Sequence, residues 1–214
     1  MKTTKWTTSS VHHQFPLSLL FCLCLLTVVW SCNKDDEQPT QSENTFTDSR
    51  DGQVYEWVIL ADGKKWMAEN CNFSVPGSWC YDNKDSNCRS HGRLYNWEAA
   101  FSACPSGWHL PTDEEWASMA KTYGGHSQDS DDSGQSAYAA LAEGGESGLN
   151  CLFSGYRHRD GEFLSMGRFY AYYWTSTEYD ELSAWSYALF DTRDQLLRIV
   201  SRKEQGFACR CVED

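Results

Sequence analysis

Cysteine is the most reactive residue type in this 214-residue chain, and the spacing of its ten copies limits what they can do. Seven follow the N-terminal segment and could pair as disulfides in an oxidising compartment: Cys71, Cys80, Cys88, Cys104, Cys151, Cys209 and Cys211. Cys80 and Cys88 close a short polar loop, CYDNKDSNC, and are the firmest expected pair. A zinc site is disfavoured because the chain has no CxxC motif and no histidine at ligand spacing from a cysteine pair. We expect up to three bridges and one free thiol.

Cys32 follows an apolar run and opens an acidic tract, so its expected chemistry is different. Lys2 and Lys5 precede the apolar run at 17–30, as in a secretory signal peptide. The run is too short to cross ~30 Å of hydrocarbon comfortably. The sequence VWSC, which ends at Cys32, resembles a bacterial lipobox, whose cysteine is acylated and becomes the mature N-terminus. The following NKDDE resembles the signal that directs lipoproteins of the Bacteroidota to the outer face of the outer membrane.

These signals divide the chain into a signal peptide at 1–31, a lipidated Cys32 with an acidic tether at 32–50, and one domain at 51–214. Lipid chains contribute about 0.8 kcal/mol per buried methylene, so an acylated Cys32 anchors a protein to the outer membrane without a spanning helix. The alternative is an ordinary secreted protein with a chance cysteine at the cleavage site.

The net charge excludes one class of partner. Removing residues 1–31 removes two of the 18 basic residues and none of the 30 acidic ones, which leaves a charge of −14. Nucleic-acid binding is driven by Lys and Arg, so we expect no nucleic-acid partner. The same charge disfavours simple electrostatic docking to anionic lipid.

An acidic stretch offers the one candidate for a bound metal. Asp129, Asp131, Ser133 and Gly134 copy the first half of a calcium loop, with oxygen ligands at positions 1, 3 and 5 and glycine at position 6. Position 12 is Ala140, so the bidentate carboxylate of such loops is missing. Calcium is therefore possible at this stretch, and the alternative interpretation is a solvated acidic loop.

Aromatic residues suggest a ligand site. The run YAYYW at 170–174 is denser than a small core needs, and aromatic rings can stack on sugars or anchor a protein partner. The candidate ligand-binding residues are Tyr156, Arg157, Tyr172, Tyr173 and Trp174.

Two helices are expected in the first half of the domain. Apolar residues at helical spacing over 94–101 predict one, which ends before Pro105. Thr112 and Glu115 form a capping box, and the apolar residues that follow at i, i+3, i+4 and i+7 predict the second.

Strands are expected on both sides of these helices. Three hairpins are predicted, over 54–69, 152–166 and 184–200, around the turns DG, DG and DTRD. The last strand, 206–212, should place Phe207, Cys209 and Cys211 on one face. Helices early and hairpins late predict an α+β domain.

Seven sequence blocks occur in an order that closely resembles the Fibrobacter succinogenes major paralogous domain, a family of exported bacterial proteins. The blocks are WMAEN at 66–70, GRLYNW at 92–97, CPSGWHLPT at 104–112, EW at 115–116, SGYR at 154–157, YWTSTE at 173–178 and RCV at 210–212. The resemblance covers nearly all of 51–214.

The same order of blocks also looks like the formylglycine-generating enzyme and sulfatase-modifying group. That second resemblance implies an unusual C-type lectin-like fold, tied by disulfides, in which the N- and C-terminal strands lie together. Cys104 and Cys211 sit where the first family usually has cysteines, so they are expected to pair. Cys209 could pair with Cys71 if the terminal strands are adjacent. Which of Cys71, Cys151 and Cys209 stays free is left open.

These observations favour a surface-anchored lipoprotein whose lectin-like domain binds an extracellular ligand such as a glycan, without catalysis. The Cys209 and Cys211 pair lacks the wider spacing of the copper-binding cysteines in the formylglycine group, and His109 is better explained as structural than as a base. No cofactor is expected apart from the possible calcium. The first alternative is a structural module that binds other envelope proteins, and a formylglycine-generating-like enzyme is a weaker one.

Overall fold

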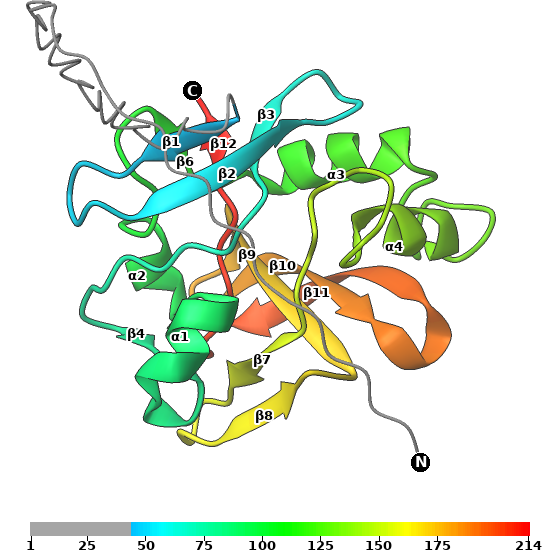
Figure 1. Cartoon of the computed structure of the whole chain (residues 1–214). Coiled ribbons are helices and arrows are strands. Elements are labelled where there is room, and N and C mark those ends of the chain that lie inside the picture. The colour runs from blue at the N-terminus through cyan, green and yellow to red at the C-terminus, as the bar shows by residue number, and fades with distance from the viewer. Residues whose placement is uncertain (1–43) are drawn as a thin grey trace, which may run out of the picture. The chain divides into compact units, whose positions relative to one another are not determined.

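Two five-stranded sheets hold most of the strands in residues 44–214, the part of the chain that the computed structural model describes (Figure 1). The first sheet contains, in spatial order, β1 (Thr45–Thr47), β2 (Val54–Ile59), β3 (Lys65–Met67), β12 (Val212–Glu213) and β6 (Trp108–His109). The second contains β11 (Gln195–Arg202), β10 (Ser183–Phe190), β9 (Tyr170–Asp180), β7 (Ser154–Arg157) and β8 (Phe163–Met166). A small third sheet pairs β4 (Ser78–Trp79) with β5 (Leu94–Tyr95).

The helices are short. They are α1 (Asp85–His91), α2 (Trp97–Ala100), α3 (Asp113–Thr122) and α4 (Gln135–Leu141), with 3₁₀ turns at Tyr81–Asn83 and Asp191–Arg193. The capping box that starts α3 is confirmed, because the Thr112 hydroxyl accepts from the Glu115 amide at 3.1 Å and the Glu115 carboxylate accepts from the Thr112 amide at 2.8 Å.

The expected α+β, C-type lectin-like fold is wrong for this chain. The described residues are mostly β, in two curled sheets, and α3, the longest helix, has ten residues against 11 in β9. The order of the seven sequence blocks indicates which local conformations follow one another along the chain. It does not specify how the strands are ordered within sheets, and that ordering is what defines a fold.

Two helix predictions also differ from the structure. Leu94 and Tyr95 form β5 instead of a helix, because the Tyr95 backbone exchanges two hydrogen bonds with Phe207, at 2.8 and 2.9 Å. The helix therefore starts only at Trp97, after the cap residue Asn96. The loop expected between Cys80 and Cys88 contains the whole 3₁₀ turn at Tyr81–Asn83 and the first half of α1.

The three predicted hairpins form as β2–β3, β7–β8 and β10–β11. The prediction did not include β9, the longest strand, which pairs with β10 along one edge and with β7 along the other. The expectation that the first and last strands share a sheet is confirmed, since β12 lies between β3 and β6.

The segment before β12 links the two large sheets (Figure 1). The Ala208 amide donates to the Tyr172 carbonyl of β9 at 3.0 Å, whereas the Met67 amide at the end of β3 donates to the Cys211 carbonyl at 2.9 Å. Its side chains alternate as predicted: Phe207, Cys209 and Cys211 lie in one buried cluster, and Ala208 lies in the other.

Arg210, within this segment, is fully buried and has no carboxylate partner among its hydrogen bonds. Its guanidinium donates to the Asn70 side chain at 2.7 Å, to the Met67 carbonyl at 3.1 Å, and to the Leu149 and Asn150 carbonyls at 2.6 Å each. A buried charge is costly unless it is fully hydrogen-bonded. Arg210 therefore ties β3 to the loop before β7.

The outer edge of β11 is partly covered by the loop at 127–134. The Ser127 amide donates to the Leu196 carbonyl at 2.8 Å, and the Leu196 amide donates to the Gly134 carbonyl at 3.1 Å. Gly134 has φ +84°, and a Cβ at this position would lie 2.7 Å from the Leu196 carbonyl oxygen. The close approach of loop and strand therefore requires glycine.

The folded region begins earlier than expected. β1 lies inside the predicted tether at 32–50, and Asp48 is buried beside Arg50, which contacts it at 2.6 Å. The signal peptide and the predicted lipidation site Cys32 lie outside the described residues. Within 44–214, no helix is long and apolar enough to cross a membrane.

Candidate functional site

The strand β9 presents different side chains on its two faces. Ala171 and Tyr173 point into the cluster that packs beneath α3 and α4, and both are fully buried. Tyr170 and Tyr172 alternate with them and therefore lie on the opposite face, where each is only partly buried. On β10, Phe190 stands directly opposite Tyr170 in the strand register.

The rings on this second face form a continuous stack. The Phe190 and Tyr170 centroids are 4.6 Å apart with an interplanar angle of 5°, and Tyr170 and Tyr172 follow at 5.3 Å. Tyr172 stacks on Phe207 at 4.6 Å, and Phe207 contacts Trp174 at 4.4 Å. The stack therefore runs from a partly exposed end at Phe190 to a buried end at Trp174.

Tyr156 of β7 completes this surface. Its ring meets Tyr172 edge-on at 4.9 Å, and it is also partly exposed. We call Tyr156, Tyr170, Tyr172 and Phe190 the aromatic face. The rings fix one another's orientation through stacked and edge-on contacts, which makes the surface rigid before any ligand arrives.

The three tyrosines of the aromatic face keep their hydroxyls free. Tyr156, Tyr170 and Tyr172 make no side-chain hydrogen bond to any residue in 44–214, whereas the Tyr173 hydroxyl donates to the Leu152 carbonyl at 3.2 Å. Burial raises the pKa of Tyr156 and of Tyr172, so both phenols stay protonated at neutral pH. Each can both donate and accept a hydrogen bond.

The sequence prediction of these residues was partly wrong. Tyr156 and Tyr172 are on the surface as expected, but Tyr173 and Trp174 are fully buried and cannot contact a ligand there. Tyr170 and Phe190 were missed. The period of two along a strand could have selected Tyr170 with Tyr172 in place of Tyr173.

Arg157 is beside this surface but is engaged by another ring. Its guanidinium lies over Trp79, 4.2 Å from the ring centroid, and its backbone exchanges hydrogen bonds with Gly206 at 2.8 and 2.9 Å. Both Arg157 and Trp79 are partly exposed, so the cation remains near the solvent.

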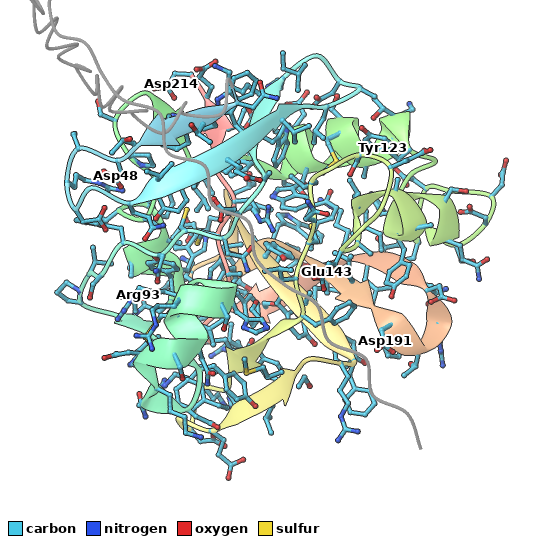
Figure 2. The ribbon with its side chains drawn as sticks, in the orientation of Figure 1. Asp48, Arg93, Tyr123, Glu143, Asp191 and Asp214 are labelled. Carbon is cyan, nitrogen blue, oxygen red and sulfur yellow. A yellow bond between two sulfur atoms is a disulfide. The ribbon has the colours of Figure 1, made fainter. Side chains whose placement is uncertain are left out.

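A polar cleft of about 340 Å³ lies elsewhere, between β2, the segment after β3, α1 and the loop after α4. Glu143, which is labelled in Figure 2, lines it from that loop. Its charged lining residues include Glu56, Glu69 and Arg89. Asn70 also lines it, and the Asn70 side chain accepts a hydrogen bond from Arg210. The aromatic rings of the face described above do not line it.

His109 borders a second cleft, of about 390 Å³. Its Nδ1 lies 2.8 Å from Asp214 and its Nε2 lies 3.0 Å from Glu115. Burial alone would raise the pKa of Glu115, but Lys64, the Thr112 amide and His109 together lower it to about 2. Since carboxylates occupy both ring nitrogens, the arrangement supports the interpretation of His109 as structural.

The acidic loop has a structural explanation for part of its sequence. Asp132 accepts from the Gly134 and Ser136 amides at 3.0 and 2.8 Å and so organises the start of α4, although the calcium-loop pattern had skipped it. Asp129 accepts from the His126 amide at 2.7 Å. A calcium site at Asp129, Asp131 and Ser133 stays a prediction.

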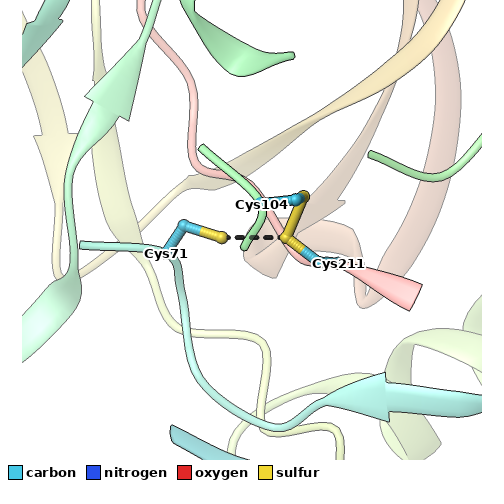
Figure 3. Close-up of side chains that lie close together, drawn as sticks. All are labelled: Cys71, Cys104 and Cys211. Carbon is cyan, nitrogen blue, oxygen red and sulfur yellow. Dashed lines mark hydrogen bonds between the residues drawn. A yellow bond between two sulfur atoms is a disulfide. The ribbon is translucent and has the colours of Figure 1, made fainter. Parts of the chain in front are cut away.

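Both expected disulfides are present, Cys80–Cys88 and Cys104–Cys211. Cys71, Cys151 and Cys209 are all free and buried, so the suggested Cys71–Cys209 bridge and the expectation of a single leftover thiol are wrong. Cys71 instead places its Sγ 3.1 Å from the Sγ of Cys211 (Figure 3).

The comparisons with known proteins place the chain in a family. A family model described as the Fibrobacter succinogenes major domain matches residues 59–213. No curated protein and no solved structure matches the chain. The match covers most of the sequence, including both large sheets except β1 and all of β2 before Ile59. The chain therefore belongs to the Fibrobacter succinogenes major domain family.

Proposed function

We propose that this protein is an outer-membrane lipoprotein, anchored through Cys32, whose domain binds an extracellular glycan without catalysing a reaction. The observation that carries the proposal is the aromatic face: three partly exposed tyrosine rings, locked by stacking, with hydroxyls that no side chain or backbone group of the described region occupies.

A sugar ring matches this surface chemically. Its hydroxyls need partners that can both donate and accept hydrogen bonds, as protonated phenols do, and its CH groups can pack against the exposed edges of the stacked rings. The row from Tyr172 to Phe190 spans successive stacked rings, which suits an extended chain better than a single monosaccharide. Because the whole chain has a net charge of −12, a neutral glycan is favoured over a strongly anionic one.

The proposed location at the outer membrane rests on the sequence around Cys32. A lipobox-like sequence, an acidic stretch after the cysteine and a short apolar leader support export and acylation. Acylation is tested by mass spectrometry of the N-terminal peptide, and Cys32→Ala is expected to release the protein from the membrane fraction.

The non-catalytic part of the proposal rests on His109 and the cysteines. A general base needs a free nitrogen within reach of a substrate, and both nitrogens of His109 already contact carboxylates. The free thiols of Cys71, Cys151 and Cys209 are buried, and burial raises the pKa of each, which disfavours the nucleophilic thiolate.

One other surface favours a second candidate function, a module that binds envelope proteins. Tyr179, Leu182 and Val200 are 55%, 52% and 42% exposed. Tyr179 and Leu182 lie at the end of the β9–β10 hairpin, and Val200 of β11 pairs with Trp185, whose ring is 5.1 Å from that of Tyr179. Exposed apolar groups of this kind are typical of protein-binding sites.

The experiment measures binding of the purified protein to a panel of neutral and anionic polysaccharides by affinity electrophoresis and calorimetry. Tyr170→Ala and Tyr172→Ala should each weaken glycan binding about tenfold, since one aromatic contact contributes roughly 0.5–1.5 kcal/mol beyond its buried area. Tyr179→Ala is the matched control, because it removes an exposed tyrosine of the same strand outside the aromatic face. Equal losses in all three variants, or no binding to any polysaccharide, would contradict the proposal.

A further inference from the structure

Three sulfur atoms meet between the two large sheets. Cys104 and Cys211 are bonded to each other, and the Sγ of Cys71 lies 3.1 Å from that of Cys211 (Figure 3). All three sulfurs lie within 4.8 Å of one another. Cys71 therefore contacts directly the sulfur that Cys104 already holds.

The backbone keeps Cys71 and Cys211 in this position. The Cys71 amide donates to the Cys209 carbonyl at 2.9 Å, and the Met67 amide donates to the Cys211 carbonyl at 2.9 Å. These two bonds bracket the cysteines on neighbouring backbone segments. The separation of their sulfurs thus depends on small side-chain rotations and not on a rearrangement of the sheets.

Cys104 is held differently. It lies on the loop between α2 and β6. The Arg50 guanidinium donates hydrogen bonds to the Ser102 and Ala103 carbonyls of this loop at 2.9 and 2.8 Å. Cys104 is 9% exposed, whereas Cys71 and Cys211 are fully buried. Of the three cysteines, it is the one closest to the solvent.

We infer that these residues form an internal thiol–disulfide exchange site, in which Cys71 replaces Cys104 as the partner of Cys211. Cys71 loses its proton to water, its side chain rotates to bring the thiolate in line with the Cys104–Cys211 bond, and the thiolate attacks the Cys211 Sγ. A Cys71–Cys211 bond forms as the Cys104–Cys211 bond breaks, and the electron pair leaves on Cys104, which takes up a proton from water. One disulfide and one thiol are present before and after, so neither an oxidant nor a reductant is required.

The exchange changes where the free thiol lies. Before it, the thiol belongs to Cys71, which no reagent reaches from the solvent. Afterwards it belongs to Cys104, which is 9% exposed and lies on a loop where Ser102 and Ser106 are exposed, although the adjacent Ala103 and Pro105 are buried. Cys104 thereby becomes a modification site for small electrophiles and disulfides, including low-molecular-weight thiol disulfides that form mixed disulfides.

The environment of Cys71 sets the pace of the exchange. Burial raises its pKa to about 12, although Arg210 and Arg50 nearby favour the thiolate. Thiolate is the attacking species, so at neutral pH the reactive fraction is small. The exchange rate should rise about tenfold per pH unit between neutral pH and pH ~10, because the thiolate fraction does so below the pKa.

The test follows the bridges in the purified full-length protein. Samples held at a series of pH values are quenched in acid, unfolded, labelled with a maleimide under mildly acidic conditions and mapped by mass spectrometry. The expected products are a Cys71–Cys211 linked peptide and label on Cys104, both forming about tenfold faster per pH unit. An intact Cys80–Cys88 peptide in the same digest shows that the bridges have not been scrambled by unfolding.

Variants separate exchange from general loosening. Cys71→Ser should abolish the labelling of Cys104, whereas Cys151→Ser, which removes another buried free thiol, should leave it unchanged. Cys104→Ser, isolated under oxidising conditions, should contain a Cys71–Cys211 bridge. The inference is overturned if Cys104 stays unlabelled in the unmodified protein at every pH, if Cys71 and Cys211 both remain thiols in Cys104→Ser, or if Cys71 pairs with Cys209.

Discussion

The two faces of the β9–β10 pair carry similar aromatic residues in different chemical states. On the inner face, Tyr187 stacks on Trp116 at 5.2 Å, and the Tyr173 hydroxyl donates to a backbone carbonyl. On the outer face, Tyr170 and Tyr172 stack equally well at 5.3 Å, but their hydroxyls have no partner in the described region. Ring stacking is therefore common to core and surface. The buried tyrosines differ from those available to a ligand in whether the hydroxyl already has a hydrogen-bond partner.

The largest expected effect contrasts truncation on the two faces. Tyr187→Ala should lower the free energy of unfolding by about 3–5 kcal/mol, because it removes a fully buried ring and leaves a cavity. Tyr170→Ala should cost about 1 kcal/mol or less, since the ring is partly exposed already. Urea unfolding followed by circular dichroism measures both. Similar losses for the two variants would show that the aromatic face is part of the core.

A smaller effect tests the hydroxyls alone. Tyr173→Phe should lower the free energy of unfolding by about 1 kcal/mol, because it removes the hydrogen bond from Tyr173 to the Leu152 carbonyl and leaves that carbonyl with the Ser154 amide as its remaining donor. Tyr172→Phe should leave unfolding unchanged within ~0.5 kcal/mol while weakening glycan binding. The two variants have the same chemistry, so each is the control for the other in denaturant unfolding. A loss of stability in Tyr172→Phe would reveal an internal partner for its hydroxyl.

Alkaline pH gives the smallest and most graded test. Burial raises the pKa of Tyr173 and of Tyr187 well above the value of about 10 in the unfolded chain. Their contribution to stability is therefore fully present below pH ~10 and is lost as the pH rises toward the raised folded-state values.

The measurement is the phenolate absorbance near pH 11. Native protein should show fewer ionised tyrosines than the eleven in the chain, and protein unfolded in urea should titrate all of them near pH ~10. Complete ionisation of the native protein without unfolding would contradict the burial of the inner tyrosines.

Signals that act over a few residues predicted the structure well. The capping box of Thr112 and Glu115, the turns of three hairpins and the alternation of Phe207, Cys209 and Cys211 are all present. Each depends on neighbouring residues or on the period of a strand, so no knowledge of distant partners is needed.

Features set by distant partners were harder to predict. Leu94 and Tyr95 have helical spacing with later residues, yet pairing with Phe207 makes them a strand. In the run 170–174, nearly every residue is aromatic, so hydrophobicity cannot show which parity faces α3 and α4. That choice, which decides between Tyr170 and Tyr173 as a ligand contact, is made by packing from outside the strand.

The fold class failed for a related reason. Strand order depends on pairings such as that of β12 between β3 and β6, which join residues about 100 or more positions apart. The family resemblances gave the sequence two long-range constraints of that kind, the Cys104–Cys211 bridge and the shared sheet of the first and last strands, and neither specifies the order of the remaining strands.

The glycine that lets the 127–134 loop lie against β11 has a consequence for how molecules of this protein behave at high local concentration. An unpaired strand edge beside an exposed aromatic surface could pair with the same edge of a neighbouring molecule and so lead to aggregation. Gly134 lets the loop approach β11 closely enough to hydrogen-bond the backbone amide and carbonyl of Leu196. That edge is therefore already partly paired within its own chain. At the crowding that the proposed membrane anchor would impose, this pairing would leave the aromatic rings available to the proposed ligand rather than to self-association.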